Sequence, residues 1–303
     1  MMDKIKCSIV TPTYNRAKTL KRLFKSLISQ TNKSFEWIVI DDGSTDNTRS
    51  LINQFMIENT GFKIKYLFQK NGGKHRAINS SFDLAEGEYF FIVDSDDILP
   101  YNSIEIILKW FESIENCKGF AGIAGLKMSI EGTQIIGDTF NGSYIDCTSL
   151  ERNVYNIFGD KAEVFYTNII KNYRFPEIEN EKFLSEAVVW NKIAEDGYKI
   201  RWFNENIYNC EYLSDGLTNN LYKNYVSSPK GFAMYLNSLI KNKQVSRLKK
   251  IYYYGLYSHL VKKNIKEVKD IFECNCFEII LGKLLYNIKN ICNQLKNSMT
   301  IRK

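Results

Sequence analysis

The sequence predicts an α/β fold in which helices cover both faces of a mostly parallel central sheet. Strand-like and helix-like segments alternate four times within residues 1–100, and polar residues follow the strands. The stretch Tyr89–Val93 is apolar without interruption, which is typical of a strand covered on both faces. Such alternation favours a doubly wound sheet with a ligand crevice at the carboxyl ends of its strands.

The first 100 residues contain four predicted strands, at 6–11, 35–40, 63–68 and 89–93. The helix after the first strand is the clearest, because apolar residues recur there at the spacing of one helix face; they are Leu20, Leu23, Phe24, Leu27 and Ile28. A second helix has its apolar face within 51–55, and a third runs from 78 to 85. Three residues are placed to cap the second helix, namely Ser44, Thr45 and Asp46.

The remainder of the chain continues the pattern less regularly. We predict helices at 102–112 and 183–194 and strands at 120–130, 134–136, 199–203 and 207–212. Residues 137–160 are rich in glycine and polar residues without a clear period, so no element is predicted there. The composition changes near Ser227-Ser228-Pro229, which predicts one domain at 1–226 and a mainly helical region at 227–303.

Composition excludes several classes of protein. With 303 residues and 44% hydrophobic content the chain can bury a large core, so it is not disordered. Its start has no long apolar segment of a signal peptide, and no window resembles a membrane span. Seven cysteines without framework spacing indicate reduced thiols, and we expect a cytoplasmic protein.

Acidic residues gather where the fourth predicted strand ends. Asp94, Asp96 and Asp97 lie within four residues and repel one another unless a cation lies between them. Carboxylate oxygens are the ligands that Mg²⁺ and Mn²⁺ prefer, and Mg²⁺ usually takes only one or two of them from protein. The alternative is an aspartate-rich turn without a ligand.

Four motifs in order resemble those of family 2 glycosyltransferases with the GT-A fold. They are Ile9-Val10-Thr11-Pro12-Thr13-Tyr14-Asn15-Arg16, Val39-Ile40-Asp41-Asp42-Gly43-Ser44-Thr45-Asp46, Asn71-Gly72-Gly73-Lys74, and Ala85-Glu86-Gly87-Glu88-Tyr89 leading into Asp94-Ser95-Asp96-Asp97. The resemblance extends from residue 5 to about 215 and is firmest up to 100. It implies transfer of a sugar from a nucleoside diphosphate donor, usually with inversion and with a divalent cation, Mn²⁺ or Mg²⁺.

The resemblance also implies roles for individual residues. Tyr14 would stack on the donor base, Asp42 would accept a hydrogen bond from a uracil, and Lys74 would reach a phosphate. The metal would be held by Asp96 and Asp97. Which of Asp94, Asp96 and Asp97 contacts the metal directly is left open. Donor-binding residues implied by the motifs are Thr11, Tyr14, Arg16, Asp42, Lys74, Asp94, Ser95 and Asp96. The alternatives are a helix-capping turn for Asp42 and a surface lysine for Lys74.

An inverting transfer also needs a general base for the acceptor hydroxyl. The family usually places an Asp of a Glu-Asp pair at a helix start about 90 residues after the metal motif. Here Ser185-Glu186 occupies that place, so Glu186 is our candidate base and Glu181 is its rival. The alternative is that Glu186 is a first-turn acid favoured by the helix dipole.

The C-terminal region differs from the rest in charge. Residues 230–303 carry 15 Lys and Arg against 4 Asp and Glu, a net charge of +11, so 1–229 carry −4 of the chain's +7. Basic helices with an apolar face can lie on anionic lipid. Packing against the catalytic domain or a partner subunit, including a homo-oligomer, is the equal alternative. No nucleic acid is expected, because no recognised module is present.

These features together predict an inverting glycosyltransferase. Residues 1–100 would bind a UDP-sugar donor, and 101–226 would carry the base and the acceptor site. The acceptor would be a polysaccharide or a lipid-linked oligosaccharide, and the enzyme could be cytoplasmic and peripheral on the membrane. A sugar-1-phosphate nucleotidyltransferase is an alternative that needs a glycine-rich loop after the first strand, and residues 11–16 contain no glycine. The other alternative is a catalytically silent assembly subunit of the same fold.

Overall fold

The computed structural model describes residues 4–58, 60–211, 216 and 219–300, with side chains up to 290. The chain divides into two compact units, the first ending at Asn220 and the second beginning at Leu221. The boundary that we expected at 226 falls near the end of the first helix of the second unit, α7 (Leu221–Ser227).

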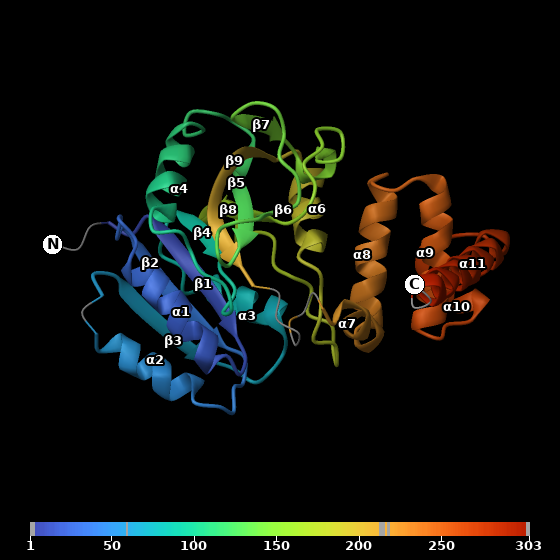
Figure 1. Cartoon of the computed structure of the whole chain (residues 1–303), viewed down its shortest axis with the longest axis horizontal. Coiled ribbons are helices and arrows are strands. Elements are labelled where there is room, and N and C mark those ends of the chain that lie inside the picture. The colour runs from blue at the N-terminus through green and yellow to red at the C-terminus, as the bar shows by residue number, and fades with distance from the viewer. Residues whose placement is uncertain (1–3, 59, 212–215, 217–218, 301–303) are drawn as a thin grey trace. The chain divides into compact units, whose positions relative to one another are not determined.

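The first unit is built on one mixed sheet (Figure 1). Its strands follow the order β3-β2-β1-β4-β8-β5-β9-β7, and β6 pairs with β5. The bounds are β1 (Cys7–Thr13), β2 (Phe35–Asp41), β3 (Lys63–Phe68), β4 (Tyr89–Ile92), β5 (Phe120–Ser129), β6 (Ile135–Ile136), β7 (Tyr144–Cys147), β8 (Lys161–Tyr166) and β9 (Lys199–Cys210).

The direction of the strands brings distant segments to one edge of the sheet. Strands β1 to β4 are parallel, whereas β8 runs antiparallel to both β4 and β5. Strand β9 is parallel to β5. The carboxyl ends of β1, β2, β4, β5 and β9 therefore meet at the same edge as the amino end of β8, and this edge is where a ligand crevice is expected.

Helices cover both faces of the sheet, as the sequence predicts. Apolar residues of α1 (Ala17–Ile28), α2 (Thr48–Met56) and α4 (Ser103–Glu112) share one buried cluster. Those of α3 (Lys74–Ser81), α5 (Thr167–Ile170) and α6 (Ala187–Glu195) share the other. Strand β2 is buried along its whole length and sends alternate residues into the two clusters, because successive side chains of a strand point to opposite faces.

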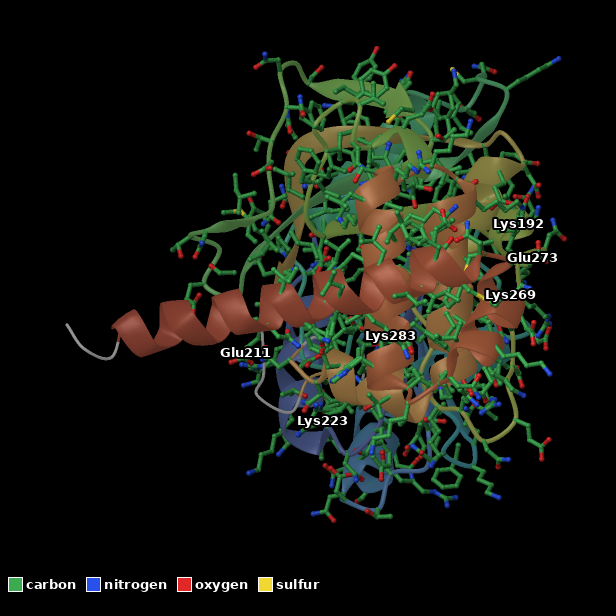
Figure 2. All side chains as sticks on the ribbon, turned by 90° about the vertical axis from the view of Figure 1, so that its right-hand side faces the viewer. Lys192, Glu211, Lys223, Lys269, Glu273 and Lys283 are labelled. Atoms are coloured by element: carbon green, nitrogen blue, oxygen red, sulfur yellow. The ribbon has the colours of Figure 1, made fainter. Side chains whose placement is uncertain are left out.

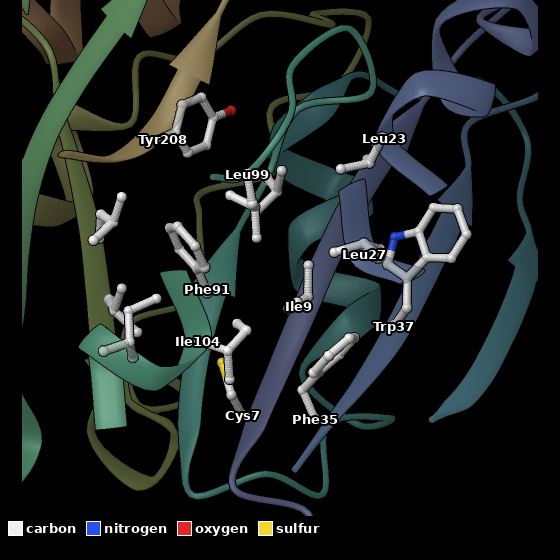
Figure 3. Packing of buried hydrophobic residues seen from close by; sticks show 14 of the residues in the cluster. Cys7, Ile9, Leu23, Leu27, Phe35, Trp37, Phe91, Leu99, Ile104 and Tyr208 are labelled. Carbon is white, nitrogen blue, oxygen red and sulfur yellow. The ribbon is translucent and has the colours of Figure 1, made fainter. Parts of the chain in front are cut away.

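The cluster under α1 and α4 is packed with aromatic rings (Figure 3). The ring of Phe24 stacks on Phe55 at 3.7 Å, and Tyr89 stacks on Phe111 at 3.7 Å. Phe91 meets Tyr208 edge to face at 6.1 Å. Tyr208 therefore belongs to the core through its ring and to the carboxyl edge of the sheet through its hydroxyl group.

Three expectations beyond residue 100 are corrected by the structure. The two predicted closing strands are one strand, β9, in which Trp202 pairs with Ala124 and Asn206 with Leu126, so extra residues bulge between them. Tyr212, the predicted end, lies outside the described residues. Helix α6 begins at Ala187 instead of Phe183. Strands β7 and β8 were not predicted.

The second unit consists of helices. They are α7, α8 (Pro229–Lys241), α9 (Arg247–Leu260), α10 (Ile265–Phe272) and α11 (Cys276–Thr300). Helix α10 begins with a capping box between Asn264 and Glu267. Among the described residues no helix is long and apolar enough to cross a membrane.

Candidate active site

The loops after β1 and β2 are tied to each other at the carboxyl edge. The backbone N–H of Asn15 donates to Ser44 Oγ at 2.8 Å, and Asn15 Oδ1 accepts from the N–H of Thr45 at 2.8 Å. Asp46 Oδ1 accepts from the N–H of Thr48, the first residue of α2, at 3.0 Å, but the N-cap residue is Asn47 instead of the expected Ser44, Thr45 or Asp46. This linkage places Tyr14, whose side chain is 49% exposed, at the rim beside the end of β2.

Asp42 holds the glycine-bearing loop that follows β3. Its Oδ1 accepts from Gln69 Nε2 at 2.7 Å and from the N–H of Gly72 at 2.8 Å. Its Oδ2 accepts from the N–H of Gly73 at 2.7 Å and from Asn71 Nδ2 at 3.1 Å. Both oxygens of this buried carboxylate are therefore in use, and a contact with a uracil would require one of the four donors to yield.

Gly73 sets the start of α3. Its φ of +98° lies in the left-handed region, and a Cβ there would stand 1.9 Å from the carbonyl oxygen of Lys182. Only glycine therefore lets the segment before α6 approach the first turn of α3. The next residue, Lys74, is the first residue of the helix and points toward the sheet edge rather than into solvent.

Lys74 joins the metal motif to the candidate base. Its Nζ lies 2.6 Å from Asp94 Oδ1 and 2.8 Å from Glu186 Oε1. Burial would lower the pKa of Lys74, but the two carboxylates outweigh it and raise the pKa above its ordinary value. Burial would raise the pKa of Asp94, and Lys74 and Lys127 instead hold it below the ordinary value. The structure thus brings together three predicted residues that are far apart in the sequence.

Glu186 reaches this position because the segment before it is fastened to α3. Arg76 donates to the carbonyl of Ile178 at 2.6 Å and to that of Glu181 at 3.0 Å. Lys182 Nζ donates to Asn71 Oδ1 at 2.8 Å. Glu186 then stands at the N-cap position of α6. Glu181, the rival candidate, is only 6% exposed.

Asp96 and Asp97 differ in surroundings. Asp97 is 5% exposed; its Oδ2 accepts from Tyr208 Oη at 2.6 Å and its Oδ1 from the N–H of Glu211 at 2.9 Å. Burial and the nearby Asp94 raise the pKa of Asp97 to about 7, and the same causes raise that of Asp96. Asp96 is only partly buried, and Ser95 between the acids is buried.

These acids fit a divalent cation in a site that is completed by a ligand. Asp96 supplies hard oxygen donors beside the buried Asp97, and a cation would relieve the repulsion that, after burial, raises the pKa values of both acids. Within the described part of the chain no three acidic, histidine or cysteine side chains are grouped to hold a metal alone. Mg²⁺ sites of this type take one or two carboxylates and complete the shell with phosphate oxygens and water.

Two charged residues of the site were not predicted from the sequence. Lys127, near the end of β5, holds its Nζ 4.5 Å from the centre of the Tyr208 ring. Its pKa would be lowered by burial but is raised by carboxylates, Asp94 most strongly. On β8, burial raises the pKa of Glu163 to about 7, and Glu186 adds to this rise. Strand pairing alone carries both residues to the edge, which no local motif indicates.

One predicted donor residue has its side chain in the core, and its assignment as a donor contact stays a prediction. The side chain of Thr11 is fully buried, and its hydroxyl accepts a hydrogen bond from Trp37 Nε1 at 2.9 Å in the core. Thr11 therefore faces the helix-covered interior, because alternate residues of β1 point away from the crevice. Arg16, in contrast, is half-buried after β1 and lies close enough to Asp96 for its charge to oppose the rise in the pKa of that acid.

An edge that combines a glycine loop, a lysine and several aspartates is typical of nucleotide-binding α/β proteins. The sequence matches the family Glycosyl transferase family 2 over residues 8–120. An uncharacterized glycosyltransferase of Nostoc sp. is 37% identical over 109 residues, which are 36% of this chain and 34% of that protein. The chain thus spans about a third of the length of the curated relatives that it matches first.

Three further similarities extend over most of the chain. A GalNAc(5)-diNAcBac-PP-undecaprenol beta-1,3-glucosyltransferase of Campylobacter jejuni is 25% identical over 89% of this chain and 86% of that protein. The crystal structure of S. aureus TarS 1–349 with UDP superposes with a TM-score of 0.60 at 21% identity, covering 84% of this chain and 70% of that chain. The mannosyltransferase PcManGT of Pyrobaculum calidifontis, in complex with GDP-Man and Mn²⁺, superposes with a TM-score of 0.55 at 16% identity. This match covers 86% of this chain and 72% of that chain.

Residues 8–120 therefore match Glycosyl transferase family 2, and the solved structures show the same fold over most of the chain.

Proposed function

We propose that the first unit transfers one sugar, with inversion, from a UDP-sugar to a polysaccharide or lipid-linked oligosaccharide. The observation that carries this proposal is the bridge that Lys74 makes between Asp94 and Glu186. It places a carboxylate that can accept a proton beside the acids that would face the donor diphosphate. In this proposal residues 1–100 form the donor half and 101–226 the acceptor half.

Glu186 acts as the general base. As a carboxylate it can take the proton of an acceptor hydroxyl, and its Oε1 lies 2.8 Å from Lys74 Nζ. As the hydroxyl oxygen attacks the anomeric carbon, the bond to the diphosphate breaks and its electrons leave with the diphosphate. Lys74 is placed to offset the charge that develops on that leaving group.

Asp96 is the residue that we assign to a divalent cation, Mn²⁺ or Mg²⁺, which would bind the diphosphate oxygens. Asp97 lies next to Asp96 and does not bind the cation in this proposal, because both of its oxygens already accept hydrogen bonds, from the Tyr208 hydroxyl group and from the N–H of Glu211. Tyr14 is sufficiently exposed to stack on the donor base. Support for the ion comes from PcManGT, whose complex contains Mn²⁺.

The donor and acceptor classes draw on the relatives. S. aureus TarS has been crystallised with UDP and with UDP-GlcNAc, which supports a UDP-sugar donor. The Campylobacter relative is named for an acceptor linked to undecaprenol diphosphate, which supports a lipid-linked acceptor. For such an acceptor we propose a cytoplasmic enzyme at the membrane surface.

The proposal is tested by release of UDP from a panel of UDP-sugars, with Mn²⁺ and after chelation. We expect metal-dependent release from one donor. Asp96→Asn should remove metal-dependent UDP binding in calorimetry. Glu186→Gln should lower turnover by about 10²–10⁴-fold while UDP binding persists, because only the base is lost.

Glu181→Gln is the matched control for the base. It should keep the activity of the wild type, and the opposite pattern would move the assignment to Glu181. If the wild type neither binds UDP nor releases it from any donor, the chain is a silent subunit and the proposal is overturned. Release of diphosphate from UTP and a sugar phosphate would favour a nucleotidyltransferase instead.

A further inference from the structure

Helix α11 is apolar on two opposite faces. One face is buried within the second unit and contains Ile279, Gly282 and Tyr286. The other face is exposed, with exposed fractions of 73%, 55%, 55% and 49% for Phe277, Ile280, Leu284 and Ile288. We call this second set the α11 ridge.

The buried face of α11 packs on α9. A Cβ on Gly282 would lie 2.2 Å from the carbonyl oxygen of Ile251, so the two backbones are in direct contact there. Tyr286 packs against Tyr252 at 6.1 Å between ring centres. The helices of this unit thus hold together through the face opposite the ridge, and the ridge adds nothing to that packing.

The ridge is continuous along the helix. At 3.6 residues per turn its four members lie within about 80° of one another. Lys283 lies about 100° and Lys289 about 140° from the centre of the ridge, and Lys289 Nζ lies 4.7 Å from the centre of the Tyr252 ring on α9. Among the second unit's side chains, Figure 2 labels Lys223, Lys269, Glu273 and Lys283. Helices that lie in the membrane interface expose an apolar stripe and carry basic residues.

The net charge of the C-terminal region favours a bilayer over a second copy of the chain as the partner of the α11 ridge. Residues 230–303 carry a net charge of +11, whereas the remainder of the chain carries −4. Two such regions repel each other when brought face to face, but each is attracted to anionic lipid by about 1 kcal/mol for each Lys or Arg near the surface. The charge therefore complements an anionic bilayer.

We propose that the α11 ridge inserts into the interfacial layer of an anionic membrane, to which the net positive charge of residues 230–303 attracts the second unit. This inference rests on the membrane association proposed above and assigns the contact with the membrane to the four residues of the ridge. It does not depend on the identity of the donor or of the acceptor.

The test is flotation of the full chain with vesicles of phosphatidylcholine, with and without phosphatidylglycerol. We expect the wild type to float with the anionic vesicles and to be released by salt. The variant Phe277→Ser/Ile280→Ser/Leu284→Ser/Ile288→Ser should partition at least about 100-fold more weakly, because each change removes an apolar side chain from the interface. Phe277→Trp should show a blue shift of its fluorescence on binding.

Leu248→Ser and Ile57→Ser are matched controls, since Leu248 and Ile57 are 62% and 86% exposed but lie outside the ridge. Both should float like the wild type. Unchanged flotation of the four-residue variant would overturn the proposal. So would a wild type that is dimeric, ignores vesicles and becomes monomeric on the four changes, because the ridge would then join two copies. UDP release measured without lipid should be unaffected, which separates this result from the proposed function.

Discussion

At the scale of single residues, the site depends on how buried charges are compensated. Lys74 lies between two carboxylates, and their attraction exceeds the cost of removing its ammonium group from water. Removing Lys74 would leave Asp94 and Glu186 as close, uncompensated acids. The same reasoning explains why Asp97 needs both Tyr208 and the N–H of Glu211, because an acid buried beside Asp94 is otherwise unstable as an anion.

His75 makes stability depend on pH. Burial lowers its pKa from 6.5 to about 4, and its Nδ1 has no hydrogen-bond partner among the described residues. Between pH 6.5 and 4 the unfolded chain takes up a proton that the folded protein excludes, so the free energy of unfolding falls as pH falls. We expect His75 to account for a loss of about 3 kcal/mol across this window.

Urea unfolding of the wild type and His75→Gln at several pH values measures this contribution. Between pH 6.5 and 4, the free energy of unfolding of the variant should fall by about 3 kcal/mol less than that of the wild type. His259→Gln changes the only other histidine of the chain, which is exposed, and should retain the wild-type slope. Parallel curves for the wild type and His75→Gln would contradict the assignment.

At the scale of elements, the start of α3 organises the site. The glycine loop is held by Asp42, the helix begins at Lys74, and the segment before α6 packs on both. The contact between Gly73 and the carbonyl of Lys182 leaves no room for a side chain. A small change at this loop should therefore disturb the lysine and the base together.

Gly73→Ala tests this coupling. Alanine would adopt a left-handed φ, which costs about 1–2 kcal/mol, and would also force Lys182 away. Gly119→Ala is the control, because Gly119 also has a left-handed φ, of +79°, but a Cβ there would have no atom within 4 Å. We expect Gly73→Ala to be at least about 2 kcal/mol less stable than Gly119→Ala. Thermal unfolding and UDP calorimetry measure the two effects. Equal stability of both variants would mean that the segment before α6 moves freely.

At the scale of the whole molecule, the chain is two units with separate cores and opposite charge. In the first unit, strands that are distant in the sequence pair in one sheet. The second unit is held together by contacts between helices, such as the one between Gly255 and Gly282. A Cβ on Gly255 would stand 2.0 Å from the Gly282 carbonyl oxygen. Damage to this crossing should therefore stay within the second unit.

Gly282→Ala should destabilise the second unit alone. Alanine is favoured over glycine in a helix by about 1 kcal/mol, but the clash with the Ile251 carbonyl at 2.2 Å reverses the sign. Hydrogen exchange should become faster in α9 and α11 and stay unchanged in β1 to β4. Asn287→Ala, on an exposed position of the same helix, should leave exchange unchanged. Faster exchange in the sheet would contradict the independence of the units.

The sequence by itself determined the alternation of strands and helices up to residue 100 and the residues at the strand ends. These features are local, since an apolar run, its flanking acids and a glycine loop are contiguous in the chain. Asp94, Asp96 and Lys74 were found this way. The burial of the Thr11 side chain could not be predicted, because its motif gives no side-chain direction until the strand is placed in a sheet.

Only the tertiary structure decided the position of β8 between β4 and β5 and the convergence of distant charges. Its pairing with β4 joins Phe91 to Val164, and that contact carries Glu163 to the edge. Tyr208 reaches Asp97 across 111 positions, and Lys74 meets Glu186 across a similar separation. Such contacts depend on packing and on electrostatic compensation between segments that have no local pattern in common, so the chain order alone does not specify them.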